Sequence, residues 1–235
     1  VFSAIVVAGL LSLATAAGAA EEGAWKRYYD VATAAYNRGE RDEAAKQFEL
    51  ALKEAQAFGE LDPRLATTLA WVAELYRSQR RFAEAEPLVK RAIEIDERTH
   101  GPDHPNVAMS LNSLALLYHN HGRQGEIEAV LKRALAIFEK SSGAEHPFVA
   151  TNLNNLGMLY RNQGRQADAE PLLTRALAIR EKVLGAAHPE TVMSRNNLAL
   201  IQNERARAAR PVPPKVAVQP VEVVRQKEGW PGPIT

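Results

Sequence analysis

The sequence predicts an all-α solenoid, in which pairs of helices repeat along the chain. Residues 101–142 and 143–184 align without a gap and are identical at 23 of 42 positions. Hydrophobic residues make up 46% of the chain and aromatic residues only 6%, so Ala and Leu supply most of the packing, as is typical of closely packed helices. A period of this length indicates a repeat architecture in which each unit packs against its neighbours.

Charge and cysteine content exclude several functional classes. The 29 basic residues are balanced by 28 acidic ones, which leaves a formal net charge of +1 among 235 residues. A nucleic-acid-binding protein needs a dense excess of Lys and Arg, so no nucleic-acid partner is expected. The chain has no cysteine, which excludes a disulfide scaffold, a cysteine-ligated metal site and thiol catalysis.

The first 20 residues have the pattern of a secretory signal peptide. They carry no charge, run from an apolar stretch into small residues that include Ala17-Gly18-Ala19, and are followed by acidic Glu21. An uncleaved membrane anchor is the alternative, because about 20 apolar residues can span a bilayer. We therefore expect an exported protein, either periplasmic or secreted, that is membrane-tethered if the segment stays uncleaved.

The other end of the chain, residues 211–235, is predicted to be a disordered tail. It holds six of the 13 prolines and shows no apolar period. A proline-rich ligand for another domain is the alternative interpretation. The helical repeats are expected to occupy residues 21–210.

Each repeat unit contains two predicted helices. In the first helix of the last complete unit, Leu153, Leu156 and Tyr160 lie on one face at helical spacing. Gly157 allows a neighbouring helix to come close, and Gly164 supplies the left-handed conformation that ends the helix. The second helix, 167–182, presents an inner stripe made of Ala169, Leu172, Leu173, Ala176, Leu177 and Ile179.

Four such units are expected at about 24–58, 62–99, 104–141 and 146–184, followed by one unpaired helix at 188–209. In that last helix, Arg195 and Gln202 occupy the positions that Leu153 and Tyr160 hold one unit earlier. Polar residues at packing positions are typical of a terminal cap, whose outer face meets water.

The unit resembles the tetratricopeptide repeat (TPR), with the spacing Leu153-x2-Leu156-Gly157-x2-Tyr160, then Ala169-x3-Leu173 and Ala176. Its 42-residue length and its Ala-Glu-Pro-Leu and His-Pro segments resemble the kinesin light chain type. The resemblance is strong over about 63–200 and weak over 25–58. It implies a right-handed solenoid whose concave surface is formed by the first helix of each unit. A motor-adaptor role is not expected, because the chain has an export-like segment and no heptad coiled coil before the repeats.

No catalytic or metal-binding constellation is found, so the chain is predicted not to be an enzyme and to need no cofactor. His104, His146 and His188 recur once per unit, each before proline. Neighbouring helices pack about 8–10 Å apart, too far for these side chains to share one metal at about 2 Å, so each is expected to stabilise its own turn. His119 and His121 lack the carboxylate pattern of a metalloenzyme helix.

The predicted concave face carries repeated asparagines. Asn is a mediocre helix former, so its repetition inside helices suggests a compensating role. An amide both donates and accepts, which suits it to grip the backbone of an extended peptide; asparagines on the inner helices have this role in the family that the chain resembles. The candidate peptide-binding residues are Trp71, Arg77, Asn112, His119, Asn120, Asn154, Asn155, Arg161, Asn162, Asn196 and Asn197.

Alternatives remain for these residues. The amides could bond to a neighbouring helix instead, or could have been copied when the repeat duplicated. Arg77 and Arg161 could contact a ligand carboxylate or be solvated. Trp71 could form the floor of an apolar pocket or belong to the core.

The predicted function is a non-catalytic scaffold that binds a peptide or a partner protein in the concave groove. The alternative is a structural component of a bacterial-type envelope assembly that acts through repeat stacking between chains.

Overall fold

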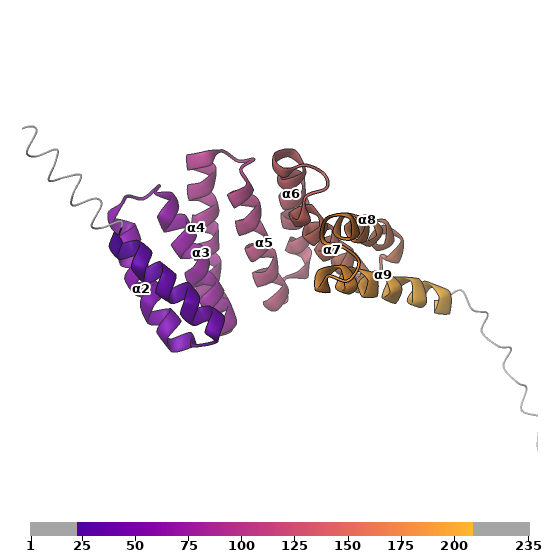
Figure 1. Cartoon of the computed structure of the whole chain (residues 1–235), viewed down its shortest axis with the longest axis horizontal. Coiled ribbons are helices and arrows are strands. Elements are labelled where there is room, and N and C mark those ends of the chain that lie inside the picture. The colour runs from indigo at the N-terminus through magenta and orange to yellow at the C-terminus, as the bar shows by residue number, and fades with distance from the viewer. Residues whose placement is uncertain (1–22, 209–235) are drawn as a thin grey trace, which may run out of the picture.

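The computed structural model describes residues 23–208, so the predicted signal segment at 1–20 and the proline-rich tail at 211–235 lie outside the described residues. The described part is an elongated array whose two termini lie at opposite ends (Figure 1). It contains helices and turns and no strand, which confirms the all-α repeat solenoid within residues 23–208. None of the helices in this part is both long and apolar enough to cross a membrane.

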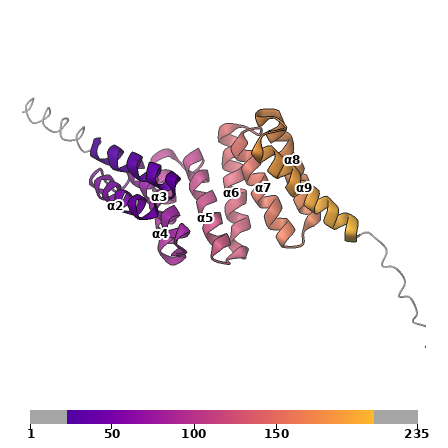
Figure 2. The same cartoon turned by 60° about the horizontal axis from the view of Figure 1, so that its bottom comes forward.

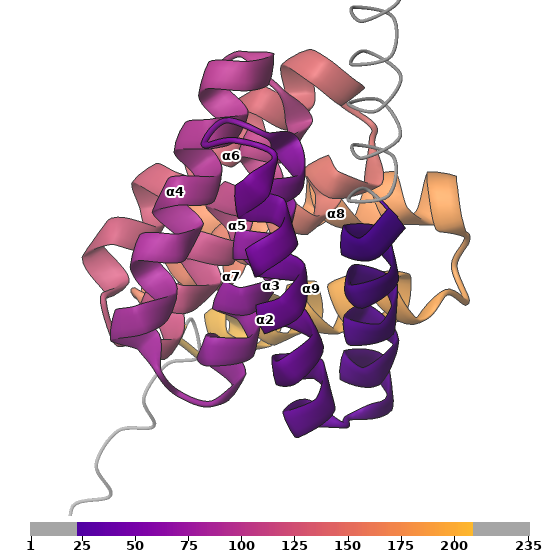
Figure 3. The same ribbon diagram turned by 90° about the vertical axis from the view of Figure 1, so that its left-hand side faces the viewer.

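The helices follow one another in antiparallel pairs (Figure 2). Each helix packs against the next one, and α3 also contacts α5, as α7 contacts α9. Successive pairs are rotated relative to each other, so α9 crosses the direction of α2 when the array is viewed from its N-terminal end (Figure 3). A helix over 23–38 is followed by α2 (Arg41–Ala57), α3 (Pro63–Ser78), α4 (Phe82–His100), α5 (Pro105–Asn120), α6 (Gln124–Ser142), α7 (Pro147–Asn162), α8 (Gln166–Leu184) and α9 (Pro189–Ala208).

The histidines that recur before proline begin the first helices, as the sequence predicted. In His104, His146 and His188, Nδ1 accepts a hydrogen bond from the backbone N–H two residues later, at 3.2–3.3 Å. Asp62 holds the same place before α3 and accepts from the Arg64 N–H at 2.8 Å. Each of these side chains satisfies a backbone donor that the first turn of a helix leaves free.

The turn inside each unit needs a left-handed residue. Gly122 and Gly164 have φ values of 78° and 76° there. The equivalent residue in the second unit is Arg80, which adopts φ 62° although it carries a Cβ. This conformation costs a non-glycine residue about 1–2 kcal/mol.

We therefore expect Arg80→Gly to raise the free energy of unfolding by about 0.5–1 kcal/mol, because relief of this strain exceeds the extra chain entropy of glycine. Urea denaturation measures the change. Gly122→Arg is the reverse control and should destabilise the protein. A loss of stability in Arg80→Gly would contradict this interpretation of the turn.

The core consists of the inward faces of both helices of each unit. Phe138, Leu153 and Leu173 are fully buried. At Gly157, an added Cβ would lie 2.8 Å from the side chain of Leu173 and 3.3 Å from the carbonyl oxygen of Ala169. Helices α7 and α8 therefore approach more closely than a larger residue at position 157 would allow.

Polar contacts tie neighbouring units together next to this core. The Tyr160 hydroxyl donates to Glu128 at 2.9 Å, and the Arg165 guanidinium both binds Glu128 and covers the Tyr160 ring at 3.8 Å. Hydrogen bonds from Lys132, which has the larger effect, and from Tyr160 lower the pKa of Glu128 to about 2. The previous unit repeats the arrangement with Glu86, Tyr118 and Arg123.

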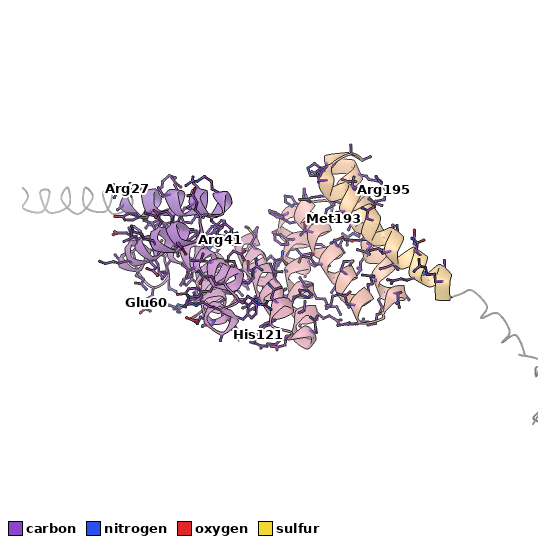
Figure 4. All side chains as sticks on the ribbon, turned by 90° about the horizontal axis from the view of Figure 1, so that it is seen from below. Arg27, Arg41, Glu60, His121, Met193 and Arg195 are labelled. Carbon is purple, nitrogen blue, oxygen red and sulfur yellow. The ribbon has the colours of Figure 1, made fainter. Side chains whose placement is uncertain are left out.

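The last helix buries one face on α8 and exposes Arg195 and Gln202. Arg195 donates to Glu181 at 2.7 Å. Figure 4 shows Met193 and Arg195 on opposite sides of α9. The exposed surface of α9 is not purely polar, because Met193 and Leu200 are also exposed.

Candidate functional site

An open groove of about 400 Å³ lies between α5 and α7, with α6 as its floor. The exposed side chain of Leu116 and the half-buried side chain of Met158 form an apolar surface within the groove. Polar groups surround them, so the groove offers both apolar contacts and hydrogen bonds. Its lining residues are Asn112, Ser113, Ala115, Leu116, His119, Ile127, Leu131, Thr151, Asn155, Met158, Leu159 and Asn162.

Leu116 and Met158 occupy equivalent positions of successive repeats, and their sequence pattern was not recognised as a candidate site. Together with Leu200 they are spaced 42 residues apart, and each directly follows the small residue of its first helix (Ala115, Gly157 or Ala199). Leu116 and Leu200 are both more than 40% exposed and lie outside the packed core, whereas Met158 is half-buried against its edge. The signal was available in the sequence as a position that is apolar at 116, 158 and 200, although the second unit holds Glu74 there.

The groove contains an amide acceptor without a partner. Oδ1 of Asn112 is buried and makes no hydrogen bond within the described part of the chain. A buried acceptor left unsatisfied costs about 1–3 kcal/mol, so a turn of the Asn112 side chain that brings Oδ1 to a ligand donor in the groove would be favoured. Asn155 is exposed on the opposite wall, where its amide is accessible to the same ligand.

Other predicted asparagines are placed differently. Asn154 is buried, and its Oδ1 accepts a hydrogen bond from Nδ2 of Asn197 at 2.9 Å. This pair joins α7 to α9, which matches the alternative that amides bond to the neighbouring helix. Asn196 and Asn120 are exposed, and neither lines the groove.

Both candidate arginines are bound to carboxylates of this chain. Nε of Arg77 donates to Glu74 at 2.6 Å, and Nε of Arg161 donates to Glu204 at 3.1 Å. Each guanidinium makes a second bond to the same carboxylate. A ligand carboxylate would have to displace these partners, so the arginines are not simply solvated, and their contact with a ligand stays a prediction.

Trp71 is half-buried in a cluster of aromatic residues. Its ring stacks on Phe48 with centroids 5.6 Å apart, and its Nε1 donates to the Tyr29 hydroxyl at 2.7 Å. It also lines a second groove, so it is at once a packing residue and a groove wall.

This second groove, of about 600 Å³, lies between the helix at 23–38, α3 and α5. Ser113 lines both grooves, which therefore adjoin on the same side of α5. A carboxylate from α4, Asp96, lies at its floor and is only 5% exposed. The groove is lined by Tyr29, Ala66, Thr67, Ala70, Trp71, Glu74, Asp96, Asn106, Met109, Ser110 and Ser113.

Burial raises the pKa of Asp96, and this effect exceeds the opposing influence of His100, of His104 and of hydrogen bonds from Asn106 and Ser110. Nδ1 of His100 is 3.7 Å from the carboxylate. The equivalent positions in the next two units hold Phe138 and Arg180, so this carboxylate is specific to one junction between units.

A folded-state pKa above the unfolded value of about 3.9 means that ionised Asp96 destabilises the fold at neutral pH. We expect Asp96→Asn to raise the free energy of unfolding at neutral pH. The gain should shrink as the pH falls through the raised pKa, because protonated Asp96 no longer carries the penalty. Urea denaturation at neutral pH and at a pH below the raised pKa tests this. A variant that is less stable than the unmodified protein at neutral pH would contradict it.

Within residues 23–208, no group of three or more His, Asp or Glu side chains is arranged to hold a metal ion. His119 lies in the first groove, where the nearest polar contact of its Nδ1 is Nε2 of Gln124 at 3.5 Å.

Several solved structures are similar in fold to this one. BtubC (BKLC) from P. vanneervenii is 24% identical over 90% of this chain and 92% of its own, with a TM-score of 0.70. A Podospora anserina kinesin light chain protein with nearly identical TPR-like repeats is 24% identical over 77% of this chain and 87% of its own, with a TM-score of 0.66. A Rap protein complexed with competence and sporulation factor is 17% identical over 79% of this chain and 50% of its own, with a TM-score of 0.63. These likenesses concern the fold.

No curated protein matches the sequence. The family model for the tetratricopeptide repeat matches residues 64–140, 125–182 and 148–210, which together span more than half of the chain. The protein therefore belongs to the tetratricopeptide repeat family.

Proposed function

We propose that this protein is a non-catalytic scaffold that binds a segment of a partner protein in the groove between α5 and α7. The observation that carries the proposal is the buried, unpartnered Oδ1 of Asn112 beside the exposed side chain of Leu116. The first favours a backbone N–H from a ligand, and the second favours an apolar side chain. A peptide supplies both groups within one residue.

The expected pose follows from this lining. An apolar side chain of the bound segment lies between Leu116 and Met158, and the segment's backbone bonds to Asn112 and Asn155. Both walls belong to first helices of neighbouring units, so the segment lies across the junction between the third and fourth units. Membership of a repeat family whose folds serve protein interaction supports this assignment. A Rap protein of similar fold has been solved with competence and sporulation factor, which supports ligand binding by such a fold.

The experiment that tests the pose compares adjacent asparagines. Peptides are selected from a random displayed library on the full chain, and the Kd of one synthetic peptide is measured by fluorescence anisotropy. We expect Asn155→Ala to weaken binding about tenfold without changing the melting temperature. Asn154→Ala should lower the melting temperature instead, because it removes the bond to Asn197. Unchanged binding in Asn155→Ala would contradict the pose.

Stacking of chains end to end is the less favoured function. Arg195 and Gln202 put exposed polar groups at the positions of α9 that correspond to the packing residues Leu153 and Tyr160. Val192, Met193 and Leu200 are also exposed on α9, so apolar surface is present there, but not at these two packing positions.

We also propose that the chain is exported. The uncharged apolar run over residues 1–20 and the small residues at 17–19 support this. Fusion of the N-terminal segment to a reporter that is active only after export tests it, and an inactive but stably produced fusion would contradict it.

A further inference from the structure

We infer that the second groove, at the junction of the second and third units, binds a lysine or arginine side chain of the partner segment, with Asp96 as its counterion. This inference rests on the proposed function, because it concerns the same bound segment. It adds the chemical class of a second anchor to the apolar anchor described above.

The charge of this groove is the first argument. Its lining residues include two carboxylates and no Lys, Arg or His. Glu74 is already neutralised by two hydrogen bonds from Arg77 at 2.5–2.6 Å, and it also accepts a bond from the Tyr36 hydroxyl. Asp96 is therefore the carboxylate in the groove that lacks a bidentate cationic partner.

Among residues 23–208, no Lys or Arg side chain is paired with Asp96, and the cationic groups that act on it are the imidazoles of His100 and His104. Its hydrogen-bond donors, Asn106 and Ser110, are neutral. Nδ1 of His100 approaches from the same helix to 3.7 Å, beyond hydrogen-bond distance, and the His100 ring stacks on His104 with centroids 4.4 Å apart. A buried carboxylate gains most from a cation that reaches it with a direct hydrogen bond.

The walls of the groove suit the rest of a basic side chain. Met109 is 51% exposed and offers apolar surface for an aliphatic stem. The aromatic side chains of Tyr29 and Trp71 line the same groove, and aromatic rings attract cations. A long side chain with an apolar stem and a charged end fits this combination better than a short polar one.

The distance between the two grooves predicts the spacing of the two anchors. Because Ser113 lines both grooves, one segment can pass from one to the other across α5. Neighbouring first helices lie about 8–10 Å apart, and an extended chain advances about 3.3 Å per residue. The basic residue is thus expected about three residues from the apolar anchor.

The test uses peptides selected from a random displayed library on the full chain. We expect the selected sequences to be enriched in Lys or Arg about three residues from an apolar position. For a synthetic peptide with Arg at this position, Asp96→Asn should weaken binding at least about tenfold. Asp103→Asn, which removes the same charge from an exposed turn, should leave the Kd unchanged.

A second comparison does not depend on the folding of a variant. Replacing the peptide's arginine by citrulline, its neutral isostere, should weaken binding to the unmodified protein by a similar factor. Asp96→Asn should then bind both peptides equally.

The outcomes separate this inference from the proposed function. If no basic residue is enriched, or if citrulline binds as tightly as arginine, the basic anchor is wrong. The groove between α5 and α7 still stands in that case, provided that Leu116→Asp with Met158→Asp abolishes binding. If that double change has no effect on binding either, the proposed function is also wrong.

Discussion

Changing Leu116 and Met158 together to aspartate is expected to weaken binding of a selected peptide at least about a hundredfold. Both side chains supply apolar surface for the ligand's anchor, and burying one apolar side chain contributes about 1.5–3 kcal/mol. Carboxylates in their place would also be desolvated by the ligand without a partner. Fluorescence anisotropy measures the Kd.

The double variant should remain folded, because Leu116 is exposed, although loss of the half-buried Met158 at the edge of the core should lower its stability somewhat. Circular dichroism checks the fold. Val183→Asp is the matched control, since Val183 is an equally exposed apolar residue on α8 that does not line the groove. Its Kd should equal that of the unmodified protein. Equal losses in both variants would show that the surface charge, and not the groove, controls binding.

Changing Phe138 to alanine is expected to lower the free energy of unfolding by about 3–5 kcal/mol. The side chain is fully buried in α6 within the largest core cluster, and its ring packs 5.1 Å from that of Phe148. Because each unit of a repeat array contacts only its neighbours, a cavity here weakens the junction between the third and fourth units. Urea denaturation followed by circular dichroism measures the loss.

Phe148→Ala is the matched control. Phe148 touches Phe138 but is 43% exposed, so its removal leaves a smaller cavity and should cost about 1 kcal/mol. Similar losses for the two phenylalanines would contradict the assignment of Phe138 to the core.

The repeat made the packing of the helices predictable. Residues 42 apart meet equivalent neighbours in equivalent units, so the apolar stripe of Leu153, Leu156 and Tyr160 could be assigned from spacing alone. All three are buried. The recurring histidines could likewise be assigned to their own turns, because a cap depends on the backbone only two residues away.

The groove was less predictable, because neighbouring positions on a helix point about 100° apart. Asn154 and Asn155 appeared equivalent as sequence columns, yet one bonds to Asn197 and the other faces the groove. The partner of Arg77 lies three residues earlier, a spacing that brings side chains together on any helix. Glu204 lies 43 residues after Arg161, so that ion pair depended on how α7 and α9 pack.

Site-specific photocrosslinking tests the location of partner binding most directly. A photoreactive amino acid is placed at position 162, an exposed groove position that the pose does not use, or at position 183 on α8, and the full chain is irradiated in the cells that produce it. We predict a crosslinked partner from position 162 that disappears when Leu116 and Met158 are changed to aspartate, and none from position 183. Crosslinks from position 183 alone, or crosslinks from 162 that survive the double change, would contradict binding in the groove.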